Sequence, residues 1–141
     1  MKKTYLHAAY LSLLLMCSSL NAMAEVVLVV ATGSPLESLS RHDIEDIFLG
    51  KTTTLPKIGK ITPLDRNDEK LREQFYTTYT GKSLSQVKSH WARIIFTGRG
   101  YPPKTVGLEE LKAALRNSSN AIGYMTPDQV DGTIKVLKLN P

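Results

Sequence analysis

Apolar residues along the chain follow two spacings, and the first of these predicts strands. Residues 25–31 (EVVLVVA) form a continuous run rich in valine, which is typical of a buried strand inside a sheet. Residues 60–65 and 121–125 predict two more strands, and residues 133–139 alternate as a last, half-exposed strand would. Proline lacks the N–H that a ladder requires, so Pro63 indicates that part of the second strand lies at a sheet edge.

The second spacing, three to four residues, predicts four helices between these strands. Capping side chains precede three of the helices, and glycine follows the first two. The expected caps and stops are Ser40 with Asp43, then Gly50; Asn67 or Asp68, then Gly81; and Ser83 with Gln86. The expected inner faces are Ile44, Ile47 and Phe48; Leu71, Phe75 and Tyr79; Leu84, Val87, Trp91, Ile94 and Ile95; and Leu108, Leu111 and Leu115. The aromatic residues of these helices, Phe96 included, are expected to lie in the core.

The order of these elements, β-α-β-α-α-α-β-β, predicts the fold class. We expect an α/β domain in which a small mixed sheet is flanked by about four helices. Residues 25–141 are long enough for one domain with one core, and they contain no repeat or low-complexity tract.

Residues 1–24 are expected to be a signal peptide rather than part of the fold. Lys2 and Lys3 precede an apolar run over residues 8–20, and the small-x-small sequence AMA ends just before Glu25. The run is short and interrupted by serine, so we expect a cleaved leader and a periplasmic protein with no stable membrane anchor. An uncleaved anchor is the alternative. The single cysteine, Cys17, lies inside this segment, so no disulfide is expected in residues 25–141.

The charge balance favours small anions over nucleic acid. The whole chain carries +5, and the leader holds two lysines but no acidic residue, which leaves +3 on residues 25–141. Basic residues are spread among acidic ones along the predicted helices. The sequence has no run of basic residues interleaved with aromatic ones. We therefore expect a small anionic ligand and no nucleic-acid partner.

The residues best suited to bind an anion lie where the second predicted strand meets the second predicted helix. Arg66, Asn67 and Asp68 follow the strand directly. A helix N-terminus presents unpaired N–H groups, and an arginine beside it adds a planar fork that matches two oxygens of a phosphate or carboxylate. The alternative is an ordinary helix cap at Asp68 beside a surface arginine.

A second candidate is the loop after the first strand, where Thr32 and Ser34 flank Gly33. Loops at the carboxyl ends of strands are the usual ligand loops of α/β sheets, and hydroxyl groups suit an anion. The alternative is a plain turn before Pro35. We find no metal-ligand motif, no complete phosphate loop and no catalytic set, so the sequence predicts neither a cofactor nor an enzyme.

Several segments together resemble a known family. They are LSRHDIEDIFLGK at residues 39–51, the strand leading into residues 65–68, the helix that contains Trp91, FTGRGYPP at residues 96–103, and AIGY at residues 121–124. In this order they resemble the periplasmic phosphate-binding proteins of ABC-type phosphate uptake transporters, and more closely the short, single-lobe proteins of that superfamily. The resemblance implies one lobe of a type II periplasmic-binding-protein fold.

The resemblance also implies roles for two residues. The larger relatives hold phosphate with an Arg-x-Asp-Gly-Ser-Gly-Thr segment at a helix N-terminus, and Arg66 and Asp68 match its arginine and aspartate. Asp68 would accept the proton of a protonated oxyanion. The hydroxyl residues of the segment are replaced, because residues 69–72 read EKLR.

These observations predict a secreted module that binds phosphate or a related small oxyanion, linked to an ABC permease or to another envelope protein. The alternative is an envelope accessory or protein-interaction module that has lost ligand binding. In the first case Arg66 should be exposed near the N–H groups of the second helix. An ion pair between a buried Arg66 and Asp68, Glu69 or Glu73 would favour the alternative.

Overall fold

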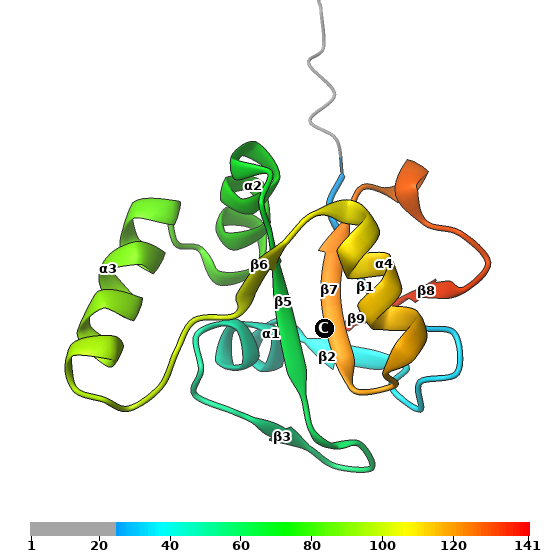
Figure 1. The fold of residues 1–141 in the computed structure, drawn as a ribbon, viewed down its shortest axis with the longest axis horizontal. Helices are drawn as coiled ribbons and strands as arrows, with labels where there is room; N and C mark the ends of the chain where they lie inside the picture. Colours follow the sequence, from blue (N-terminus) through cyan, green and yellow to red (C-terminus); the bar gives the residue numbers. More distant parts are fainter. Residues whose placement is uncertain (1–24) are drawn as a thin grey trace, which may run out of the picture.

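The structure, a computed structural model, describes residues 25–141, so the expected signal peptide lies outside the described residues. The main sheet has the strand order β6-β5-β7-β1-β8 (Figure 1). Its strands are β1 (Val27–Ala31), β5 (Thr62–Arg66), β6 (Lys104–Val106), β7 (Ala121–Met125) and β8 (Ile134–Val136). β5 pairs in parallel with β6 and β7, while β1 pairs antiparallel with β7 and β8. β1 therefore runs against the other four strands.

Helices cover both faces of this sheet. α1 (Arg41–Phe48), α2 (Glu69–Thr80) and α3 (Leu84–Phe96) bury their apolar side chains with one face, and α4 (Leu108–Asn117) packs on the other. A short 3₁₀ helix, η1 (Pro127–Gln129), follows β7. The predicted fold class, a small mixed sheet flanked by about four helices, is confirmed.

The helix caps read from the sequence form as expected. Ser40 with Asp43 and Ser83 with Gln86 make reciprocal capping boxes at the starts of α1 and α3. Asp68, rather than Asn67, caps α2. Gly81 ends α2 in the left-handed conformation, with a φ of 67°.

Short strands are the elements that the sequence did not reveal. β6 lies in a segment for which the sequence predicted no element, and the predicted last strand divides into β8 and β9 (Lys138–Asn140). β9 pairs with β2 (Ser38–Ser40), and β3 (Thr54–Leu55) forms a hairpin with β4 (Gly59–Lys60). Two or three residues contain too few alternations to distinguish a strand from a loop.

The proline in β5 sits where the ladder is incomplete, as predicted. β6 pairs with β5 only from Leu64 onward, so at Pro63 the strand has its partner on the β7 side alone. The missing N–H of Pro63 therefore breaks no bond to β6.

The end of α3 differs from its predicted packing. Leu84, Val87 and Trp91 are buried, but Ile95 is 48% exposed and Phe96 93% exposed. The prediction that Phe96 lies in the core is wrong, because five residues after Trp91 correspond to about 140° around the helix. Phe96 therefore lies on the outer side of α3.

Candidate oxyanion-binding site

Three neighbouring strands end at one edge of the sheet, and each leads into a helix. β6, β5 and β7 are parallel neighbours, followed by α4, α2 and η1 respectively. The amino ends of these helices therefore gather along the same edge (Figure 1). In open α/β sheets this edge is the usual ligand site, because helix N-termini favour anions.

Arg66, the last residue of β5, is buried, and its guanidinium has only neutral hydrogen-bond partners. The residue is 4% exposed, and its Nη1 lies 3.4 Å from the carbonyl oxygen of Tyr124 and 3.4 Å from Oε1 of Gln129. Its Nε is buried and has no hydrogen-bond partner among the described residues. Burial lowers the pKa of the guanidinium, and nearby Tyr124 and Asp68 act against that shift. The group stays charged, because arginine is protonated at any ordinary pH.

Two expectations for Arg66 can be judged from this geometry. The prediction that Arg66 is exposed is wrong. The alternative arrangement is not found either, since no ion pair joins Arg66 to Asp68, Glu69 or Glu73 among the described contacts. Alternation along β5 explains the burial, because Arg66 shares its face with Leu64, which packs with α4.

Asn67 lies beside the start of α4. Its N–H donates to the carbonyl of Val106 over 3.0 Å. Gly107 is the N-cap of α4 and supplies no side-chain cap, and a Cβ placed on Gly107 would lie 3.5 Å from Nδ2 of Asn67. The uncapped end of α4 and the Asn67 amide thus offer N–H donors in one place.

Asp68 is exposed, and its side chain caps the start of α2. Its Oδ1 accepts a hydrogen bond from the N–H of Leu71 over 3.0 Å. This contact satisfies one of the free donors that an anion at the start of α2 would use.

Gln129, at the end of η1, is the residue of this edge that the sequence did not single out. Its Oε1 accepts from the N–H of Thr126 over 3.3 Å, as well as from Arg66. The spacing Thr-x-x-Gln is that of a capping box, so the sequence contained a signal for the helix start but none for the contact with Arg66.

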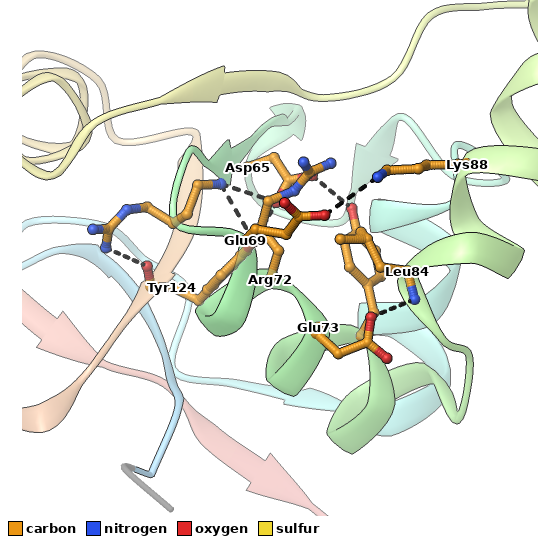
Figure 2. Close-up of polar contacts among 9 residues, drawn as sticks. Asp65, Glu69, Arg72, Glu73, Leu84, Lys88 and Tyr124 are labelled. Carbon is orange, nitrogen blue, oxygen red and sulfur yellow. Dashed lines mark hydrogen bonds and ion pairs between the residues drawn. The ribbon is translucent and has the colours of Figure 1, made fainter.

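A buried polar cluster on the opposite face of β5 holds this region together (Figure 2). Asp65 is 2% exposed, and Oδ2 lies 3.1 Å from Nη2 of Arg72 and 3.1 Å from the hydroxyl of Tyr76. The hydroxyl of Tyr124 donates to Oδ1 of the same carboxylate. Burial, followed by the charge of Asp65, raises the pKa of both tyrosines, so both remain donors. Arg72 therefore forms an ion pair with Asp65, and this ion pair links α2 to β5.

Thr32 and Ser34 lie at the other end of the sheet. They follow β1, which runs antiparallel to β7, whereas Arg66 ends β5, which runs parallel to β7. Thr32 donates to the carbonyl of Gly132 over 3.1 Å, and the buried Ser34 accepts from the N–H of Leu36. Thr32 also borders a separate depression of about 470 Å³ with Gly33, Thr133 and residues 116–119. The two candidate groups, Arg66 with Asn67 and Asp68, and Thr32 with Ser34, therefore lie at opposite ends of the sheet.

Two further features of residues 25–141 bear on function. No three His, Cys, Asp or Glu side chains of this part of the chain are grouped as a metal site would require. None of its helices has the length and apolar character of a membrane crossing.

No model of a known protein family matches the chain, and no match is found among curated proteins. Solved structures do match it. An ABC-type phosphate transport receptor from Vibrio cholerae aligns over 81% of this chain and 45% of its own, with a TM-score of 0.62 and 18% identity. A structure described as a phosphate ABC transporter substrate-binding protein with bound phosphate, from Clostridium perfringens, aligns over 81% and 44%, with a TM-score of 0.61 and 18% identity.

PstS from Borrelia burgdorferi aligns over 82% of this chain and 47% of its own, with a TM-score of 0.56 and 11% identity. The chain thus spans less than half the length of each of these proteins. At this level of identity the likeness concerns the fold. The chain has the fold of one lobe of phosphate-binding proteins of ABC transporters, as its sequence predicted.

Proposed function

We propose that this lobe binds phosphate or a related small oxyanion at the edge where β5, β6 and β7 end. The observation that carries the proposal is Arg66, a buried guanidinium whose partners are neutral oxygens at 3.4 Å and whose Nε has no partner among the described residues. A buried charge is costly unless an opposite charge or strong hydrogen bonds compensate it. An oxyanion would supply both.

Gln129 suggests how the anion would be received. Its amide oxygen accepts from Arg66 and from the N–H of Thr126, which are donors that a phosphate oxygen could use. In the proposed mechanism the anion displaces this amide, and Asn67 with the uncapped start of α4 donates to further oxygens. Asp68 can accept the proton of a protonated oxyanion through the oxygen that does not cap α2. Thr32 and Ser34 take no part in this site.

The pattern of residues 1–24 supports a proposal for where the protein acts. We infer that residues 1–24 direct export and are removed, and that residues 25–141 act in the periplasm. Two of the matched structures are described as proteins of ABC phosphate transport. An ABC permease is therefore the first partner to test, and another envelope protein the second. The proposed role is binding rather than catalysis.

One observation favours the alternative function, an accessory or interaction module without a ligand. Asp68 already caps α2, and Glu69 is an exposed acidic residue in its first turn. Both features weaken an anion site at this particular helix. The proposed site accordingly relies on Arg66, Asn67 and the start of α4.

Calorimetric titration of residues 25–141 with phosphate tests the proposal. A single lobe leaves the ligand partly hydrated, so we expect a dissociation constant on the order of 10⁻⁴ M or weaker. Arg66→Met should abolish this binding while the protein remains folded and at least as stable, since an apolar side chain replaces an uncompensated buried charge. Arg116→Gln, a change at an exposed arginine, should leave binding unchanged.

The result also separates the two functions. Absence of phosphate binding, or equal binding by the Arg66→Met protein, would reject the site and favour the interaction module. Nanomolar binding by a monomer would contradict the proposed contribution of a single open lobe.

A further inference from the structure

The C-terminal end of α3 and the loop that follows it carry the most exposed aromatic side chains of the described residues. Phe96 is 93% exposed, Tyr101 84% and Ile95 48%. In Figure 1, α3 stands at the left margin of the molecule, and the chain leaves its end in a loop toward β6. We call residues 92–101 the α3 tip. These three side chains lie within seven consecutive residues, and exposed apolar side chains that form a patch usually mark a contact surface.

Charge is concentrated in the same part of the chain. Residues 74–108 contain no aspartate or glutamate, and they carry five basic residues. These residues are Lys82, Lys88, Arg93, Arg99 and Lys104. The other described residues together carry a net charge of −2. The expectation that basic residues are spread among acidic ones therefore does not hold for residues 74–108.

Two of these cations are not neutralised. Lys82, Lys88 and Lys104 form ion pairs with glutamates outside the stretch. The exposed side chains of Arg93 and Arg99 have no ion pair with any described residue. Each lies three residues from Phe96, so the free cations flank the most exposed aromatic side chain.

We propose that the α3 tip docks onto a lipid surface that contains anionic headgroups. Arg93 and Arg99 would bind the headgroup phosphates, while Phe96, Tyr101 and Ile95 enter the boundary between headgroups and acyl chains. Arginine beside aromatic residues is a combination suited to this boundary, where one end of the side chain is apolar and the other is wet.

The small size of the surface favours lipid over a folded protein. A stable protein interface buries roughly 800 Å² on each partner. Phe96 and Tyr101 contribute about 150–250 Å² each, so these two side chains alone fall short of that area. A second copy that used the same surface would bring Arg93 and Arg99 against their own counterparts, which like charges oppose. A bilayer needs no complementary shape and supplies the negative charge.

The tip is also separate from the oxyanion site. α3 packs in the layer of α1 and α2, whereas Arg66 lies on the face of the sheet that α4 covers. Loss of either activity should therefore leave the other intact.

Flotation with lipid vesicles tests the docking. The protein used is residues 25–141, which contain the whole described fold, because the apolar leader would itself bind lipid. We expect binding to vesicles of phosphatidylcholine with phosphatidylglycerol, little binding to phosphatidylcholine alone, and weaker binding as salt is raised. Phe96→Ala with Tyr101→Ala should lower the partition coefficient roughly tenfold or more, and Arg93→Gln or Arg99→Gln roughly fivefold each.

Matched substitutions elsewhere serve as controls. Leu139→Ala removes apolar surface from a side chain that is 46% exposed, and Arg116→Gln removes an exposed cation. Both should retain vesicle binding, and all variants should keep the parent melting temperature. Phe96→Trp should bind as the parent does and shift its tryptophan emission to the blue on vesicles, since the native Trp91 is already buried.

Equal binding to vesicles with and without phosphatidylglycerol would overturn the proposal. A loss of vesicle binding in Leu139→Ala or Arg116→Gln as large as that in the α3-tip variants would also overturn it. Binding to an acidic protein or peptide without any binding to anionic vesicles would overturn it as well, in favour of a protein partner.

Discussion

Two arginines near the end of β5 show how much the partner of a buried guanidinium matters. Arg72 faces the carboxylate of Asp65 at 3.1 Å, and two tyrosine hydroxyls complete that cluster. The guanidinium of Arg66, next to Asp65 in sequence, lies away from that carboxylate because successive strand residues point to opposite faces, and only the backbone N–H of Arg66 donates to Oδ1 of Asp65. Its guanidinium is left with the weak acceptors Tyr124 and Gln129. Because of this difference, the contacts of the Arg66 guanidinium are the ones to test by substitution.

Gln129→Glu should place a carboxylate where the Gln129 amide now contacts Arg66. The new ion pair would compensate the buried charge, so we expect the free energy of unfolding to rise by about 1–3 kcal/mol. The same carboxylate would occupy the place proposed for the anion, so phosphate binding should be lost. Urea denaturation and calorimetric titration measure the two effects.

Gln86→Glu is the matched control for this substitution. Gln86 also accepts from a capping-box N–H, that of Ser83 over 2.9 Å, but it lies at the exposed start of α3 and contacts no arginine in the described structure. It should change stability by less than about 0.5 kcal/mol. If Gln129→Glu has no larger effect than Gln86→Glu, the contact with Arg66 has no energetic importance.

At the scale of elements, the position of α3 depends on the glycine that ends α1. Gly50 has a φ of 73°, and the ring of Trp91 packs directly on it. His90 strengthens the same junction, since its Nε2 lies 2.8 Å from the carbonyl oxygen of Leu49. The sequence indicated Gly50 as a helix stop but not as the contact surface for Trp91, because that contact joins residues about forty positions apart.

Gly50→Ala should therefore destabilise the protein in two ways. The left-handed backbone costs about 1–2 kcal/mol for a residue with a side chain. The added methyl group would lie 2.5 Å from Cη2 of Trp91, and overpacking of this kind costs about 1–3 kcal/mol more. Gly81→Ala separates the two effects, because Gly81 has a φ of 67° and nothing within 4 Å of the added Cβ. Equal losses in denaturant unfolding would show that Trp91 simply moves aside.

Helix caps explain why the elements themselves were largely predictable. Each cap is a local signal, confined to Ser40 with Asp43, to Asp68, or to Ser83 with Gln86. The direction of β1 is not local, because it depends on pairing with strands that follow about ninety residues later. For that reason the sequence offered Thr32 and Arg66 as candidates without showing that they lie at opposite ends of the sheet. The surroundings of Arg66 are equally non-local, since its guanidinium contacts Tyr124 and Gln129, about sixty residues later in the chain.

At the scale of the whole molecule, one surface carboxylate should make stability depend on acid. Hydrogen bonds from Thr133, followed by Lys112 at 3.2 Å, lower the pKa of Asp131 to about 2. These contacts join α4 to the loop before β8. Because the folded pKa lies below the unfolded value, the contribution is complete above about pH 4 and disappears as the pH falls toward 2.

Thermal unfolding as a function of pH measures this contribution. The melting temperatures of the parent and of Asp131→Asn should differ at neutral pH and converge near pH 2. Asp128→Asn, a nearby change at an exposed carboxylate, is the control. A constant difference across the acid range would show that the contribution of Asp131 does not depend on its charge.

The antiparallel position of β1 also has a consequence for how the protein is made. β1 is the first of the described strands to be synthesised, yet both of its partners, β7 and β8, begin about ninety or more residues later, with Val30 opposite Lys135. The centre of the sheet therefore closes only by long-range pairing, which is slow because a large loop must be ordered first. Until residues 121–136 have been synthesised, the nascent chain contains β1 without a neighbour and no finished sheet. If residues 1–24 act as the proposed signal peptide, a secretion channel that engages them during synthesis meets a chain without a finished main sheet to unfold.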